Sequence, residues 1–194
     1  MKLELPDHLD EAYTQATSCA SIGQLEYEIR FLLIWLHDVV KPNYTVEIGT
    51  NMGGMAYVLD AVTTEKTVTI DTHRLVNPAV QNLNILYVLK NSQRPETGIH
   101  VTQALGGPID FLFIDGDHSE EGVKSDYRIW RPRVRSGGWI GLHDINNDSC
   151  PGVRKLWESI QGEKIEIVQT PYHNNVHGYS GQIGCGGIGV VKKP

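Results

Sequence analysis

Acidic and histidine side chains follow two short apolar runs, and together they have the residue types of a metal site. Asp115 closes the run IDFLFID, His118 follows three residues later, and His143 and Asp144 close the run GGWIGLHD. Two carboxylates and an imidazole can bind Mg²⁺ or Mn²⁺ while water and substrate oxygens complete the shell. A histidine beside such an ion can accept the proton of a substrate hydroxyl, because its pKa lies near neutrality. These patterns predict a divalent metal site at Asp115, His143 and Asp144, with His118 as the base.

The same residues have ordinary structural interpretations. Residues 119–121, Ser-Glu-Glu, are typical of a helix start, with a capping hydroxyl and acids in the first turn, and this is the interpretation we favour for them. His118 could instead face solvent just before that helix, and His143 could be a core residue or support a ligand from outside the coordination shell. Both alternatives stay open, and the sequence assigns no role to Asp117.

A glycine-containing turn after another β-branched run predicts a second binding site. The stretch VEIGTNMGG carries Glu47, Gly49 and Gly53 in the spacing E-x-G-x-x-x-G, which differs from the G-x-G-x-x-G of dinucleotide folds. A carboxylate in this turn would repel pyrophosphate but attract a cationic ligand such as a sulfonium. Asp71 ends the next predicted strand, where an acid can accept hydrogen bonds from both ribose hydroxyls. A nucleoside with a cationic tail describes S-adenosylmethionine, and a purely structural turn is the alternative.

Alternating apolar patterns predict the elements that position these residues. Helical periodicity or capping signals favour helices over 24–40, 52–62, 96–105, 119–134 and 151–160. Short β-branched runs favour strands over 44–49, 66–71, 83–90, 109–115, 137–144, 164–169 and 187–193. Strands that alternate with helices indicate an α/β fold, a Rossmann-like three-layer sandwich with a mostly parallel sheet covered on both faces. Only a loop separates the last two runs, which permits an antiparallel hairpin between them.

The carboxyl ends of parallel strands meet at one edge of a sheet, where ligands bind in open α/β folds. Gly49, Asp71, Asp115 and His143 all follow or close predicted strands. We therefore expect the turn after the first strand and the acid and histidine groups to face one crevice.

Length and composition indicate one domain and exclude several classes of partner. The 194 residues are assigned to a single domain, with an N-terminal helical segment (1–40), a cofactor-binding core (41–160) and C-terminal strands with a Gly-rich loop (161–194). A net charge of −6 lacks a basic footprint for nucleic acid or an anionic membrane. Three distant cysteines and the absence of a leader or spanning pattern predict a cytoplasmic protein, and a homo-oligomer stays open. The segment around His173 and His177 is predicted to be a substrate-covering loop.

The motifs resemble those of a known enzyme family over about residues 24–160. VEIGTNMGG, TIDTHR, DFLFIDGDHSEEGVKSDYRIWRPRVRSGGWIGLHDI and PGVRKLW are similar to class I S-adenosylmethionine-dependent methyltransferases. The likeness is to the small-molecule O-methyltransferase group related to macrocin O-methyltransferase and cephalosporin hydroxylase. It implies a seven-stranded sheet with an antiparallel last strand.

The resemblance also implies roles for particular residues. Metal-dependent relatives use an acid after strand four and an acidic pair after strand five, which match Asp115 and the pair His143 and Asp144. This pair reads His-Asp here and not as two acids. A histidine three residues past the first acid, matching His118, serves as the base in some relatives. With neighbouring positions included, the predicted donor site comprises Glu47, Gly49, Thr50, Asn51, Gly53, Asp71, Thr72, Ser92 and Asp115.

Three functions are compatible with these patterns. The first is a metal-assisted O-methyltransferase that acts on a hydroxyl of a small molecule, such as a sugar or a natural-product intermediate. The second is a hydroxylase-like oxidoreductase on the same fold, because two histidines and a carboxylate can bind iron. The third is a non-catalytic module that binds the nucleoside.

Overall fold

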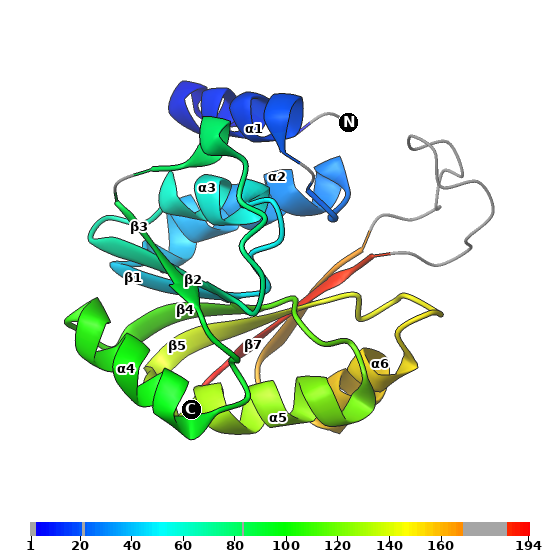
Figure 1. Ribbon diagram of the computed structural model, residues 1–194. Coiled ribbons are helices and arrows are strands. Elements are labelled where there is room, and N and C mark those ends of the chain that lie inside the picture. Colours follow the sequence, from blue (N-terminus) through cyan, green and yellow to red (C-terminus); the bar gives the residue numbers. More distant parts are fainter. Residues whose placement is uncertain (1–2, 21, 83, 169–185) are drawn as a thin grey trace.

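The computed structural model describes residues 3–20, 22–82, 84–168 and 186–194 (Figure 1). Its helices are α1 (Asp7–Cys19), α2 (Glu26–Trp35, continued by a wider turn over Leu36–Val40), α3 (Gly54–Asp60), α4 (Pro95–Leu105), α5 (Glu120–Trp130) and α6 (Pro151–Ser159). Its strands are β1 (Tyr44–Ile48), β2 (Lys66–Asp71), β3 (Ile85–Leu89), β4 (Ile109–Ile114), β5 (Val134–His143), β6 (Lys164–Ile167) and β7 (Ile188–Lys192). The predicted loop around His173 and His177 lies outside the described residues.

The strands form one seven-stranded sheet in the order β3-β2-β1-β4-β5-β7-β6. The pairs among β1 to β5 are parallel, whereas β7 runs antiparallel to both of its neighbours, β5 and β6. This topology confirms the predicted Rossmann-like sheet, its antiparallel last strand and the hairpin formed by the last two strands. The chain order reverses at β1, whose neighbours are β2 and β4, and ligands of open α/β sheets bind at such a switch point.

Helices cover both faces of the sheet, with α1, α2 and α3 on one face and α4, α5 and α6 on the other (Figure 1). Strand β4 shows how the sequence produces these three layers. Phe111 and Phe113 point to the core under α1 to α3, while Leu112 and Ile114 point to the core under α4 to α6. Every residue of β4 is buried, which explains the continuous apolar run over residues 111–114.

Strand β5 and the N-terminal segment differ from those predicted. Strand β5 begins at Val134, three residues before the predicted start, and pairs with β4 through a register shift between Ile109 and Phe111. Asp144 lies just beyond the strand because β5 ends at His143. The N-terminal segment contains α1 in addition to the predicted helix over 24–40. In the part of the chain that the structure describes, no helix combines the length and apolar character needed to cross a membrane.

Candidate functional site

The turn after β1 packs directly on the end of β4. Gly49 has a φ of +98°, and a Cβ atom at this position would lie 2.1 Å from the carbonyl oxygen of Asp115. The amide of Asp115 in turn donates to the carbonyl of Ile48 at 2.8 Å. Only glycine permits both this backbone conformation and this contact. The two sites predicted separately from the sequence therefore meet at Asp115.

Asp71 connects the ends of β1 and β2. Its carboxylate accepts backbone N–H bonds from Asn51 at 3.0 Å and from His73 at 2.9 Å, and 21% of its side chain is exposed. Asn51 has a φ of +46°, which is uncommon for a residue with a side chain. A carboxylate has about four acceptor positions, so two remain for hydroxyl donors such as those of a ribose. Thr72, the next residue, is exposed beside it.

Glu47 lies beneath the turn and is completely buried. Its Oε2 accepts from the hydroxyl of Thr69 at 2.5 Å, and Thr69 is 2.7 Å from the hydroxyl of Thr50. Burial raises the pKa of Glu47 well above its usual range, which favours the uncharged carboxyl over the carboxylate. From the sequence we predicted a negative charge that faces the ligand. In this structure Glu47 is instead connected to the turn by hydrogen bonds through Thr69 and Thr50.

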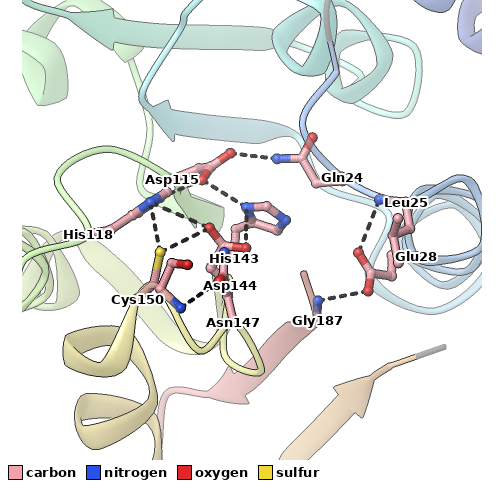
Figure 2. A network of polar contacts seen from close by, with 11 residues as sticks. Gln24, Leu25, Glu28, Asp115, His118, His143, Asp144, Asn147, Cys150 and Gly187 are labelled. Atoms are coloured by element: carbon pink, nitrogen blue, oxygen red, sulfur yellow. Dashed lines mark hydrogen bonds and ion pairs between the residues drawn. The ribbon is translucent and has the colours of Figure 1, made fainter. Parts of the chain in front are cut away.

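Asp115 is the centre of a second polar cluster, which Figure 2 shows at the ends of β4 and β5. Its Oδ1 is 3.0 Å from Nε2 of His118 and 3.0 Å from Nδ1 of His143. Its Oδ2 accepts from Nε2 of Gln24 at 2.5 Å. Nδ1 of His118 is 3.4 Å from Oδ2 of Asp144. One ligand atom from each of Asp115, His118, His143 and Asp144 lies within 4.8 Å of the others.

The charges of this cluster support one another. Burial raises the pKa of Asp115, but His143 and His118 outweigh burial and bring that pKa below its usual range. Burial lowers the pKa of His143, yet the attraction of Asp115 and Asp144 raises it to about 9. The hydrogen bond to Asp115 likewise raises the pKa of His118. The cluster therefore favours positive charge beside its two carboxylates, and a divalent cation would supply such charge.

Asp144 is held in an unusual conformation at the end of β5. Its φ is +62° although it is not a glycine, and it is 6% exposed. Its Oδ2 is 3.5 Å from Sγ of Cys150, which is also 3.5 Å from Nδ1 of His118. Backbone conformations of this kind cost roughly 1–3 kcal/mol and concentrate at functional sites.

Gln24 and Cys150 also belong to this cluster, although neither was predicted from the sequence to be a site residue. Gln24 lies just before α2 and is 7% exposed. It contacts Asp115, which is 91 positions away in the sequence. No local pattern announces such a contact. The sequence carries a weak signal for Cys150. It precedes Pro151, which is typical of the first residue of a helix, and the start of that helix lies at this crevice.

Ser92 and Asp117 take part in the packing of the loop after β3 against α5. The indole nitrogen of Trp130 donates to the carbonyl of Ser92 at 3.0 Å, and Gln93 donates to Oδ2 of Asp117 at 3.2 Å. Oδ1 of Asp117 accepts from the amide of Ser119 at 3.0 Å. Asp117, which the sequence could not place, thus connects this loop to the start of α5. Ser119 accepts from the amide of Gly122 at 3.1 Å, which confirms the predicted helix cap.

Asp126 is a buried acid on α5 beneath the same loops. It is 0% exposed, and neither of its oxygens forms a hydrogen bond of normal geometry with the described residues. Burial raises the pKa of Asp126 to about 6, against a lowering influence of the Ser92 side chain. A carboxyl whose pKa is higher in the folded chain than in the unfolded chain costs stability once the pH exceeds both values.

We therefore expect Asp126→Asn to raise the free energy of unfolding near pH 8 by about 1–3 kcal/mol. The destabilisation by Asp126 grows as the pH rises from about 4 to about 6. The advantage of the asparagine variant should therefore disappear near pH 4. Urea denaturation of both proteins at the two pH values measures this difference, with the exposed Asp148→Asn as the control. A variant less stable than the wild type near pH 8 would contradict the burial argument.

Comparisons with known proteins point to one family. A family model described as a methyltransferase domain matches residues 46–145, just over half of the chain. Rhamnosyl O-methyltransferase of Mycobacterium leprae (strain TN) is 24% identical over 141 residues, which are 66% of this chain and 61% of that protein. The chain thus spans less than two thirds of this curated relative.

Two solved structures show the same fold. An O-methyltransferase from Bacillus cereus in complex with SAH superposes with a TM-score of 0.62 and 16% identity, covering 98% of this chain and 93% of its own. The MycE methyltransferase of the mycinamycin biosynthetic pathway, in complex with Mg, SAH and mycinamycin VI, has a TM-score of 0.59 and 20% identity, covering 74% and 40%. At these identities, the two likenesses establish the fold.

Proposed function

The chain belongs to the methyltransferase domain family, and from this premise we propose that it methylates a hydroxyl group of a small molecule with S-adenosylmethionine as the donor. The observation that carries the proposal is the meeting of the turn after β1 with the polar cluster at Asp115. A donor on that turn and a hydroxyl at that cluster would be neighbours, as direct transfer between two substrates requires. Two of the proteins named above, from Mycobacterium leprae and Bacillus cereus, are O-methyltransferases, which supports the choice of a hydroxyl acceptor.

The donor site follows from the contacts of the turn. Asp71 is free at its exposed edge to accept the ribose hydroxyls, and Asn51 is held beside it in a fixed backbone conformation. Ser92 lies in the loop after β3, and the family resemblance is our reason for proposing it as a neighbour of the adenine. The full proposed donor site comprises Glu47, Gly49, Thr50, Asn51, Gly53, Asp71, Thr72, Ser92 and Asp115.

A divalent cation fits the polar cluster by the chemistry of its donors. Asp115, His143 and Asp144 are the residues that we propose to hold it, and their donor atoms already converge. Donor atoms on one ion with bonds of about 2.1 Å lie about 3.0–3.4 Å apart. Nδ1 of His143 lies 3.0 Å from Oδ1 of Asp115, within this range, and 3.7 Å from Oδ1 of Asp144, slightly beyond it.

His118 is the group that we propose to accept the acceptor's proton. Its Nδ1 faces Asp144 and Cys150, which fix the plane of the ring, and its Nε2 faces Asp115. An acceptor hydroxyl that displaced the Asp115 contact would place its proton at Nε2. When bound, S-adenosylmethionine supplies an electrophilic methyl group and a divalent cation lowers the pKa of the hydroxyl. The side chains around His118 then orient the hydroxyl oxygen toward its Nε2.

Isothermal titration calorimetry with S-adenosylmethionine and with S-adenosylhomocysteine, the product of donor demethylation, tests the proposal most directly. We expect binding in the micromolar range, followed by release of S-adenosylhomocysteine with one member of a panel of hydroxylated small molecules. Absence of binding up to low-millimolar ligand would refute the proposed function.

Asp71→Ala should weaken the binding of S-adenosylhomocysteine by about 10- to 100-fold, because it removes a charged acceptor of two ribose hydrogen bonds. Asp71→Asn should cost less, since its amide oxygen still accepts one. Calorimetry provides the affinities, and thermal unfolding shows whether the turn stays folded. Asp38→Ala, an exposed acid in the segment before β1, is the matched control and should bind like the wild type.

A further inference from the structure

Nitrogen and sulfur atoms surround the two carboxylates of the polar cluster. Nδ1 of His143 is 3.0 Å from Asp115 and 3.7 Å from Asp144, and this imidazole is 5% exposed. On the other side of Asp144, Nδ1 of His118 and Sγ of Cys150 lie 3.4 Å and 3.5 Å from its Oδ2. An ion that contacts both carboxylates would therefore also lie next to the imidazole nitrogen atoms of His118 and His143.

The nearby amide of Gln24 does not add an oxygen to this set. Figure 2 shows its nitrogen directed at Asp115, with the amide oxygen pointing away from the cluster. That oxygen is buried without a hydrogen-bond partner among the described residues. Rotating the amide to present it would lose the 2.5 Å bond from Nε2 to the Asp115 carboxylate. The protein thus supplies two carboxylates, two imidazoles and a thiol at this place.

Mg²⁺ and transition ions respond differently to such donors. Mg²⁺ demands a nearly octahedral shell of oxygens and retains several waters. Imidazole is a ligand that suits zinc, iron and copper, and thiolate is a ligand that suits zinc and Cu(I). A buried imidazole that occupies one ligand position removes one oxygen that Mg²⁺ requires. The donor set therefore disfavours the ion that the sequence analysis named first.

We infer that this cluster selects a first-row transition ion of the zinc and iron(II) class over Mg²⁺, with His143 as the residue that sets the preference. The inference rests on the proposed function, because the ion is the one that would assist the transfer to the hydroxyl. Cys150 and His118 strengthen the preference by placing soft and nitrogen donors around Asp144.

The test compares ion selectivity between the wild type and a variant in which an acid replaces His143. Chelator-treated full-length protein is titrated with Zn²⁺ and with Mg²⁺ by calorimetry, and the ratio of the two affinities is the readout. Most mixed sites bind Zn²⁺ more tightly than Mg²⁺, so only the change in the ratio is informative. We expect His143→Asp to lower the Zn²⁺ to Mg²⁺ ratio by about 100-fold or more. His100→Asp, an exposed histidine on α4, is the control and should leave the ratio unchanged.

An unchanged ratio in folded His143→Asp would overturn the inference, as would wild-type protein that binds Mg²⁺ as tightly as Zn²⁺. Because this buried substitution could prevent folding, a second measurement uses the wild type alone. Its copper(II) form should show nitrogen hyperfine splitting in the electron paramagnetic resonance spectrum, and a spectrum from oxygen ligands only would overturn the inference.

Calorimetry with S-adenosylhomocysteine on the same samples separates failure of this inference from failure of the proposed function. Donor binding without the expected ion preference refutes this inference alone, and absence of donor binding refutes the proposed function.

Discussion

Asp115→Asn is expected to reduce turnover by about 100- to 1000-fold, because the carboxylate contributes several kcal/mol by holding the cation and the two histidines. Asparagine keeps the size of the side chain, and its oxygen can still accept one N–H bond. It cannot balance the charge of His118 and His143, both 3.0 Å away. The affinity for a divalent cation should fall by a similar factor.

Two measurements check this expectation. Calorimetry with Zn²⁺ reports the loss of cation affinity without an acceptor, and release of S-adenosylhomocysteine reports turnover once an acceptor is found. Asp117→Asn is the matched control, since Asp117 lies two residues away but contacts Gln93 and Ser119 and not the cluster. It should change both quantities by about twofold or less. Equal effects of the two substitutions would contradict the central place of Asp115.

Gly49→Ala is expected to lower the free energy of unfolding by about 3 kcal/mol or more, because it combines backbone strain with a collision. The φ of +98° is unfavourable for alanine, and the new methyl group would lie 2.1 Å from the carbonyl oxygen of Asp115. That oxygen belongs to the backbone and cannot turn aside. The turn after β1 would have to separate from β4, so donor affinity should fall as well.

Gly106→Ala separates strain from collision. Gly106 ends α4 with a φ of +84°, and no heavy atom lies within 4 Å of a Cβ built there. Alanine at this position should cost only about 1 kcal/mol for the left-handed conformation. Urea denaturation of both variants measures the difference. Similar losses for the two would mean that the contact between Gly49 and Asp115 does not hold the site together.

Local patterns were sufficient for the sheet and for much of the site. Residues 111–114 of β4 are all apolar because both faces of the strand are buried, and the runs that end in Asp71, Asp115 and His143 place these residues at strand ends. One general rule, that parallel strands carry their ligands at the carboxyl edge, was enough to bring these residues together. The helix cap at Ser119 was equally local.

Other features depended on contacts between distant segments. Gln24 reaches Asp115 from before α2, and Cys150 lies near His118 only because α6 begins beside α5. The early start of β5 at Val134 arises from pairing with β4, since the residues there have no apolar alternation of their own. Sequence patterns report the exposure of a residue's own segment and do not report which remote side chain faces it.

The sequence by itself determined which residues stand at the ends of the strands, because strand patterns, turn glycines and the edge rule are properties of neighbouring residues. Only the tertiary structure decided their chemical state. The pKa of Glu47 is raised because the fold removes it from water, and the pKa of Asp115 is lowered because the fold places two imidazoles against it. Burial and charge pairing are set by atoms from separate segments, and those atoms meet only when the chain is folded.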